Sequence, residues 1–164
     1  MTNNEKFIYI IDTSSILDLF KLYPQDIFLE LWKKLDEIVK EGRLISHKFV
    51  LDELKKKFDE AYKWAMSRKN IFIDITLQQI EAVKIILHKY PEFADPEKDI
   101  DADPWLVALA LEKPSQQRLI SVVKVIVTEE RFKPNKINIP FVCQEFGIEC
   151  ITLIDLMRKE GWRL

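Results

Sequence analysis

Short apolar runs alternate with longer amphipathic segments along this chain. Residues 7–11 (FIYII) form one continuous apolar run, and residues 122–128 (VVKVIVT) form another that is rich in β-branched side chains. Runs of this kind are typical of strands buried on both faces of a parallel sheet. Residues 43–45 and 148–152 predict two shorter strands, and residues 71–75 form either a short strand or an extended entry into a helix. A central sheet of four or five strands is therefore expected.

The segments between these runs have helical periodicity. Apolar residues recur every three or four positions over 26–40 and over 46–69, which predicts two amphipathic helices, the second capped by Ser46. Strands that alternate with helices favour an α/β fold in which a parallel sheet lies between two helical layers. A chain of 164 residues fits one such domain, spanning 1–164. Further helices are expected at 78–90, 105–111, 139–146 and 153–159.

Polar and special residues mark where several helices begin and end. Asp12 follows the first strand and precedes a helix that Pro24 should end. Asp103 is expected to be the N-cap of a helix whose first position is Pro104. Gly147 is expected to end the helix before the last strand.

Composition limits the classes of protein to which the chain can belong, but it does not identify a binding partner. The net charge of −2 is unlike that of strongly basic nucleic-acid-binding domains, but a local basic patch matters more than the total. Cys143 and Cys150 lack the spacing of a zinc site or a disulfide framework, so reduced thiols in a cytoplasmic protein are expected. No signal peptide or bilayer-length apolar stretch is evident, so no membrane association is expected.

Four acidic positions fall where the predicted elements begin or end. Asp12 follows the first strand, and Glu130 follows the strand at 122–128. Glu53 lies on the helix after the second strand, beside its apolar stripe, and Asp103 begins another helix. Ligands of open parallel sheets bind beyond the carboxyl ends of the strands, so these carboxylates are expected to meet there. Converged carboxylates repel one another, and a divalent cation usually compensates for that repulsion.

Each acidic residue also has a simpler structural interpretation. Asp12 is a natural helix cap, and Glu53 is one more charge beside three lysines at 55–57. Asp101 is either an additional metal ligand or a charge in an acidic loop. Glu129 and Glu130 are consistent with a turn. The metal hypothesis depends on all of these positions being compatible at once.

Four motifs together resemble the PIN-domain nucleases, and most closely their VapC-like branch. Residues 10–14 (IIDTS) resemble the opening strand and first aspartate, and residues 50–54 (VLDEL) resemble the helix that carries a glutamate. Residues 103–110 (DPWLVALA) resemble the third acid and its helix, and residues 127–130 (VTEE) resemble the last motif. Where the family usually has a fourth aspartate, this chain has Glu130. The resemblance covers nearly the whole chain and implies a PIN-like three-layer α/β/α fold.

The resemblance also implies a reaction, which is cleavage of RNA phosphodiester bonds with Mg²⁺ or Mn²⁺. Asp12 and Asp103 would bind the principal metal, with Asp101 as a further candidate ligand. Glu53 would orient or deprotonate the attacking water or complete the site. Glu130 would hold an outer-sphere water or a second metal.

Further residues and partners follow from the same resemblance. Ser14 would contact a ligand carboxylate or a phosphate oxygen, and Arg131 and Lys133 would contact the RNA backbone. A VapC-like toxin implies an antitoxin protein as partner, and the amphipathic helices offer surfaces for that partner or for a homodimer. The alternatives are a PIN nuclease of RNA processing and a catalytically inactive PIN-like interaction module. A haloacid-dehalogenase phosphatase is disfavoured, because its second aspartate is replaced here by Ser14.

Overall fold

The structure, a computed structural model, describes residues 5–114 and 121–164. Within these ranges the chain forms one five-stranded sheet in the order β3-β2-β1-β4-β5, and all of its neighbouring strands are parallel. The expected α/β class and the parallel sheet of four or five strands are therefore confirmed. The strands are β1 (Glu5–Ile11), β2 (Leu44–His47), β3 (Phe72–Ile73), β4 (Ser121–Val127) and β5 (Glu149–Ile151).

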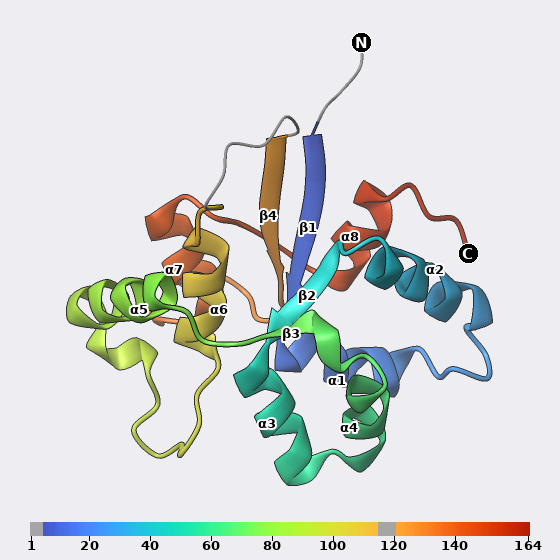
Figure 1. Cartoon of the computed structure of the whole chain (residues 1–164), viewed down its shortest axis with the longest axis horizontal. Coiled ribbons are helices and arrows are strands. Elements are labelled where there is room, and N and C mark those ends of the chain that lie inside the picture. The colour runs from blue at the N-terminus through green and yellow to red at the C-terminus, as the bar shows by residue number, and fades with distance from the viewer. Residues whose placement is uncertain (1–4, 115–120) are drawn as a thin grey trace.

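Helices cover both faces of this sheet and also gather at one of its ends (Figure 1). Helices α5, α6 and α7 lie to one side, α2 and α8 lie to the other, and α1, α3 and α4 lie near the ends of the arrows. This arrangement is the predicted three-layer α/β/α fold. The helices in the described ranges are α1 (Thr13–Leu22), α2 (Leu29–Lys40), α3 (Lys48–Lys57), α4 (Asp59–Met66), α5 (Leu77–Lys89), α6 (Asp103–Leu111), α7 (Ile139–Phe146) and α8 (Leu153–Lys159).

The pairing of β1 with β4 sets the position of the candidate site. The two strands are in register from Glu5 beside Ser121 to Ile11 beside Val127. Their last three residues are buried, as expected for strands covered on both faces. Because Asp12 and Thr128 each follow the last paired residue, the register carries both to the same edge of the sheet.

The long helix predicted over 46–69 is wrong in two respects. His47 rather than Ser46 is the N-cap, because its Nδ1 accepts a hydrogen bond from the backbone N–H of Phe49 at 3.2 Å. Ser46 instead lies within β2 and donates from Oγ to the carbonyl of Ile11 at 2.6 Å. The helix also breaks at Phe58, which is both the C-cap of α3 and the N-cap of α4. The apolar periodicity continues across this break, so the pattern alone gave no sign of it.

The helix predicted over 26–40 begins three residues later than expected, at Leu29. The backbone N–H groups of Ile27 and Phe28 both donate to the carbonyl of Pro24, which closes a turn before the helix starts. Ile27 is consequently 69% exposed and does not join the buried stripe of α2.

The predicted N-cap of α6 is also wrong. Ala102 occupies the cap position, while Asp103 and Pro104 are the first two helical residues. Asp103 makes no capping hydrogen bond with its side chain. The backbone N–H of Asp103 is satisfied instead by Oδ1 of Asp101, at 3.1 Å. The carboxylate of Asp103 is thereby left for other interactions.

Other helix ends agree with the sequence. Asp12 caps α1, and Gly147 ends α7 with a positive φ of 71°.

Cys143 is buried, Cys150 is partly buried, and both are free thiols. Across 5–114 and 121–164, no helix has the length and apolar character needed to cross a membrane.

Candidate active site

A cleft of about 460 Å³ lies beyond the carboxyl ends of β1 and β4. It is lined by all four of the acidic residues that the sequence was expected to bring together, Asp12, Glu53, Asp103 and Glu130. They come from four separate parts of the fold: the end of β1, helix α3, the start of α6 and the segment after β4. The lining of the cleft includes Asp12, Thr13, Ser14, Glu53, Lys56, Lys57, Phe58, Glu97, Lys98, Asp99, Asp103 and Glu130.

Asp12 is the most firmly held of these carboxylates. Its Oδ1 accepts the backbone N–H of Ser15 at 2.8 Å, which caps α1. Ser14 Oγ lies 2.9 and 2.8 Å from the two carboxylate oxygens, and Thr128 Oγ1 donates to Oδ2 at 2.5 Å. Burial raises the pKa of Asp12 to about 6, although the hydrogen bonds from Thr128, Ser15 and Ser14 oppose that rise. Asp12 is thus both a helix cap and a wall of the cleft.

Glu53 points from α3 into the same cleft. Thr13 Oγ1 donates to its Oε1 at 2.9 Å, and the ammonium of Lys98 lies 3.9 Å from Oε2. Burial raises the pKa of Glu53, while the hydrogen bond from Thr13 and the charge of Lys98 lower it. The sequence placed Glu53 beside the apolar stripe of its helix, and the structure shows that this side of α3 faces the strand ends.

Asp103 lies at the first position of α6 and is only partly exposed. Its carboxylate accepts no hydrogen bond from any described residue. Burial raises its pKa to about 8, and the nearby charges of Glu130, Asp101 and Asp12 add to that rise. In the absence of a divalent cation, Asp103 therefore favours its protonated form at neutral pH, although the charge of Lys98 opposes this.

The two adjacent glutamates after β4 have different surroundings. Glu130 lines the cleft, and its Oε2 accepts the backbone N–H of Ile139 at 3.2 Å, at the start of α7. Glu129 is not part of the cleft lining, and its Oε1 accepts the backbone N–H of Leu153 at 2.8 Å, at the start of α8. The structure thus distinguishes two residues whose roles the sequence left open.

Of four further residues that were predicted to belong to the site, Ser14 lines the cleft and the other three do not. Asp101 is not part of the cleft lining, and its two oxygens accept backbone N–H groups of Asp95 and Asp103. Ser14 lies in the cleft, where it bonds to the Asp12 carboxylate. Arg131 and Lys133 are exposed and are not among the lining residues.

The cations of the cleft come from segments that the sequence did not favour. Lys56 and Lys57 extend from the end of α3, and Lys98 comes from the acidic loop before α6. Neither group was among the phosphate contacts expected from the sequence, which were Arg131 and Lys133. The available signal for Lys98 was its position as a lone cation among Asp95, Glu97 and Asp99, since such a cation is suited to neutralising nearby carboxylates.

The oxygen donors of the cleft are chemically suited to a hard divalent cation. Mg²⁺ and Mn²⁺ prefer carboxylate oxygens, and each of the four acids supplies them. Asp103 has no competing hydrogen bond to a described residue, and its neighbours repel its negative charge. Among residues 5–114 and 121–164, however, no three Asp, Glu, His or Cys side chains are already grouped closely enough to hold a metal ion. The carboxylates share one cleft without being preassembled around an ion.

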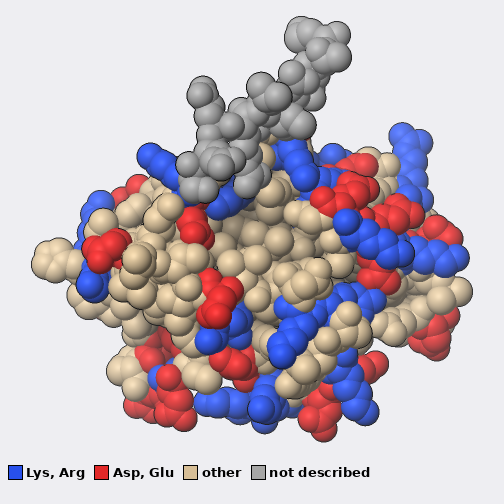
Figure 2. Space-filling view, viewed as in Figure 1, with Lys and Arg blue, Asp and Glu red and all other residues tan. Residues whose placement is uncertain are grey.

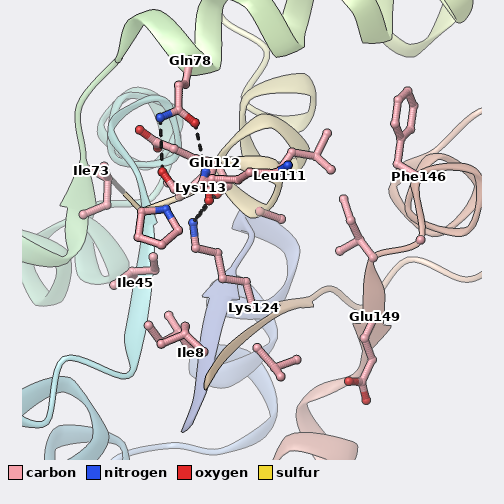
Figure 3. A pocket seen from close by; sticks show the side chains of 17 residues that line it. Ile8, Ile45, Ile73, Gln78, Leu111, Glu112, Lys113, Lys124, Phe146 and Glu149 are labelled. Atoms are coloured by element: carbon pink, nitrogen blue, oxygen red, sulfur yellow. Dashed lines mark hydrogen bonds between the residues drawn. The ribbon is translucent and has the colours of Figure 1, made fainter. Parts of the chain in front are cut away.

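A second, larger cleft of about 830 Å³ lies over the sheet near the beginning of β4 (Figure 3). Ile8, Ile45 and Ile73 contribute apolar side chains to it, and Lys124 donates to the carbonyls of Leu109 and Glu112 at 3.0 and 2.6 Å. It lacks the converging acids of the first cleft.

On the face shown in Figure 2, acidic and basic side chains are interspersed, and neither sign forms a continuous patch.

Comparisons with known proteins bear on the family of the chain. A comparison with curated proteins found no match. A family model described as "Domain of unknown function (DUF4411)" matches residues 9–164. That range includes β1 from Tyr9 onward, all four acids of the cleft and the final helix. Because the match covers nearly the whole sequence, the chain belongs to the DUF4411 family.

Proposed function

We propose that this protein is a metal-dependent endoribonuclease that hydrolyses RNA phosphodiester bonds with Mg²⁺ or Mn²⁺. One observation carries the proposal: carboxylates from four separate elements line a single cleft at the carboxyl end of a parallel sheet. The pKa of Asp103 is raised to about 8 in that cleft. A bound cation would offset both the burial of this carboxylate and the repulsion by Glu130, Asp101 and Asp12 that together raise its pKa.

The chain's own contacts suggest a role for each acid. Asp12 and Asp103 would hold the ion, because Asp12 is fixed by Ser14 and Thr128, while no described residue donates a competing hydrogen bond to the Asp103 carboxylate. Glu53, oriented by Thr13, would position or deprotonate the attacking water. When bound, Mg²⁺ or Mn²⁺ supplies an activated water and neutralises charge on the scissile phosphate. Glu130, whose carboxylate is held at the start of α7, would contribute that carboxylate to the metal site.

RNA is proposed as the substrate because the four acidic motifs resemble those of PIN-domain nucleases. The cleft itself supports a polyanion, since Lys56 and Lys57 lie at its edge, beside the acids. These lysines replace Arg131 and Lys133 as the proposed phosphate contacts. A toxin role, an antitoxin partner, a homodimer and a cytoplasmic location stay predictions from the sequence.

The experiment that tests this function is RNA cleavage by purified protein with Mn²⁺, with Mg²⁺ or with a chelator. Asp12→Asn and Asp103→Asn are expected to abolish cleavage, because each removes one charge from the proposed metal site. Asp26→Asn is a matched control, since Asp26 is exposed in the turn before α2. Chelator-resistant cleavage, or full activity of both cleft variants, would contradict the mechanism. Inactivity of every protein, together with RNA binding, would favour a non-catalytic interaction module.

A further inference from the structure

The loop before α6 is built so that it holds a lysine in the carboxylate cleft. The backbone N–H of Lys98 donates to the carbonyl of Asp95 at 3.2 Å, and the Asp95 carboxylate accepts the N–H of Glu97 at 3.0 Å. Pro96 at the second position suits such a turn. Asp101 then ties the base of the loop by accepting the N–H of Asp95 at 2.8 Å. Local hydrogen bonds thus fix the position of Lys98 before any ligand arrives.

The ammonium of Lys98 interacts with acids of the cleft. Its Nζ lies 3.9 Å from Oε2 of Glu53, and its side chain is 46% exposed. Partial desolvation lowers the pKa of Lys98, but the charges of Asp101, Asp103 and Glu53 outweigh it and raise that pKa. In return, the charge of Lys98 lowers the pKa values of Asp103 and Glu53. Lys98 therefore supplies positive charge in the place where a divalent cation is proposed to do so.

The other two lysines of the cleft differ in their contacts. Lys56 pairs with Asp99 at 3.5 Å, and Asp99 is itself largely exposed. Lys57 forms no ion pair with any residue that the structure describes. Of the described cations, Lys98 is thus the one in ion-pair contact with Asp12, Glu53, Asp103 or Glu130.

We infer that Lys98 is an internal counter-ion of the cleft, whose charge competes with a divalent cation held by Asp12 and Asp103 and whose ammonium leaves Glu53 when that cation binds. This inference rests on the proposed function, because it assumes that Mg²⁺ or Mn²⁺ binds at these carboxylates. Displacement would leave the turn at Asp95 intact, since the turn is held by backbone groups, and would move only the flexible lysine side chain. Lys98 then weakens metal affinity and reduces the repulsion among the metal-free carboxylates.

The test is a calorimetric titration of Mn²⁺ into metal-free protein without RNA, so that catalysis does not enter. Lys98→Gln is expected to bind Mn²⁺ about five- to tenfold more tightly than wild type, because a competing charge about 4 Å away is removed. Lys57→Gln is the matched control, since it removes the same charge from the same cleft without breaking an ion pair. Its affinity is expected to stay within about twofold of wild type. Lys98→Arg keeps the charge and is expected to retain the weaker affinity.

A second measurement uses the wild-type protein alone. Amine labelling followed by mass spectrometry is expected to show that Mn²⁺ increases the modification of Lys98 but not of Lys57. Equal Mn²⁺ affinities for Lys98→Gln and Lys57→Gln, or unchanged labelling of Lys98, would overturn the inference. If Asp103→Asn still abolished binding in that case, the proposed function would stand without it. Absence of Mn²⁺ binding in every protein would overturn both.

Discussion

Thr128 donates a hydrogen bond from Oγ1 to Oδ2 of Asp12 at 2.5 Å, and the two residues are 116 positions apart in the sequence. The contact follows from the register of β1 and β4, whose last paired residues immediately precede Asp12 and Thr128. Thr128 also accepts the backbone N–H of Glu130 at 3.1 Å. One buried hydroxyl therefore bonds both the carboxylate of Asp12 and the backbone of Glu130, and joins the segments after β1 and β4 beside the cleft.

Thr128→Val is expected to destabilise the fold by about 1–3 kcal/mol, because it removes one hydrogen bond from the buried Asp12 carboxylate and the partner of the Glu130 backbone N–H. It is also expected to lower cleavage, because Asp12 loses one of the contacts that orient it. Chemical denaturation and the RNA cleavage assay measure the two effects. Thr128→Ser keeps the hydroxyl and should retain most of both properties. Wild-type activity in Thr128→Val would contradict an orienting role.

Asp103→Asn is expected to raise the stability of the metal-free protein at alkaline pH. The pKa of Asp103 is about 8 in the folded chain, against a usual value of 3.8, so the folded state keeps a proton that the unfolded state has lost between these values. The contribution of Asp103 to wild-type stability therefore falls as pH rises from about 4 to about 8. Thermal unfolding in chelator should show the variant gaining on wild type across that range. Parallel pH profiles for the two proteins would contradict a raised pKa.

Glu130→Gln and Glu129→Gln form a matched pair. Both substitutions keep an oxygen that can accept the helix N–H group which each glutamate now bonds, so both proteins are expected to fold. Glu130→Gln is expected to lower cleavage or Mn²⁺ affinity about tenfold or more, because a carboxylate of the cleft is lost. Glu129→Gln is expected to leave both near wild type. Equal losses in the two variants would show that Glu130 has no special role.

Glu160→Gln tests a part of the fold that is remote from the proposed chemistry. Glu160 binds Arg43 through two hydrogen bonds of 3.0 and 2.7 Å and accepts another from Tyr9. Because the Glu160 and Arg43 side chains are only 11% and 17% exposed, the substitution is expected to cost about 2–4 kcal/mol of stability. Arg158→Gln removes an exposed ion pair and should cost about 0.5 kcal/mol or less. Denaturation midpoints of the two variants measure the difference.

The sequence predicted the sheet well because its signals are local. The apolar runs at 7–11 and 122–128 became β1 and β4, and the alternation of strands with helices was enough to predict a parallel sheet. The convergence of Asp12, Glu53, Asp103 and Glu130 was also predictable, since parallel strands all end at one edge.

The incorrect predictions arose where tertiary contacts outweighed the local structural preferences of the residues. Ser46 is a better cap than His47 by residue type, but its hydroxyl is held by the carbonyl of Ile11 across the sheet. The break at Phe58 has no glycine or proline to announce it. Lys98 was missed because its loop looked like solvated charge, and only the fold brings that loop against Glu53.

The most direct test of the account is a crystal structure of the protein grown with Mn²⁺ and recorded at a wavelength where manganese scatters anomalously. The account predicts an anomalous peak in the cleft, in contact with the carboxylates of Asp12 and Asp103, and the loss of that peak in Asp103→Asn. An empty cleft at millimolar Mn²⁺, or a peak only at acids outside it, would contradict the claim that these four carboxylates form a metal site.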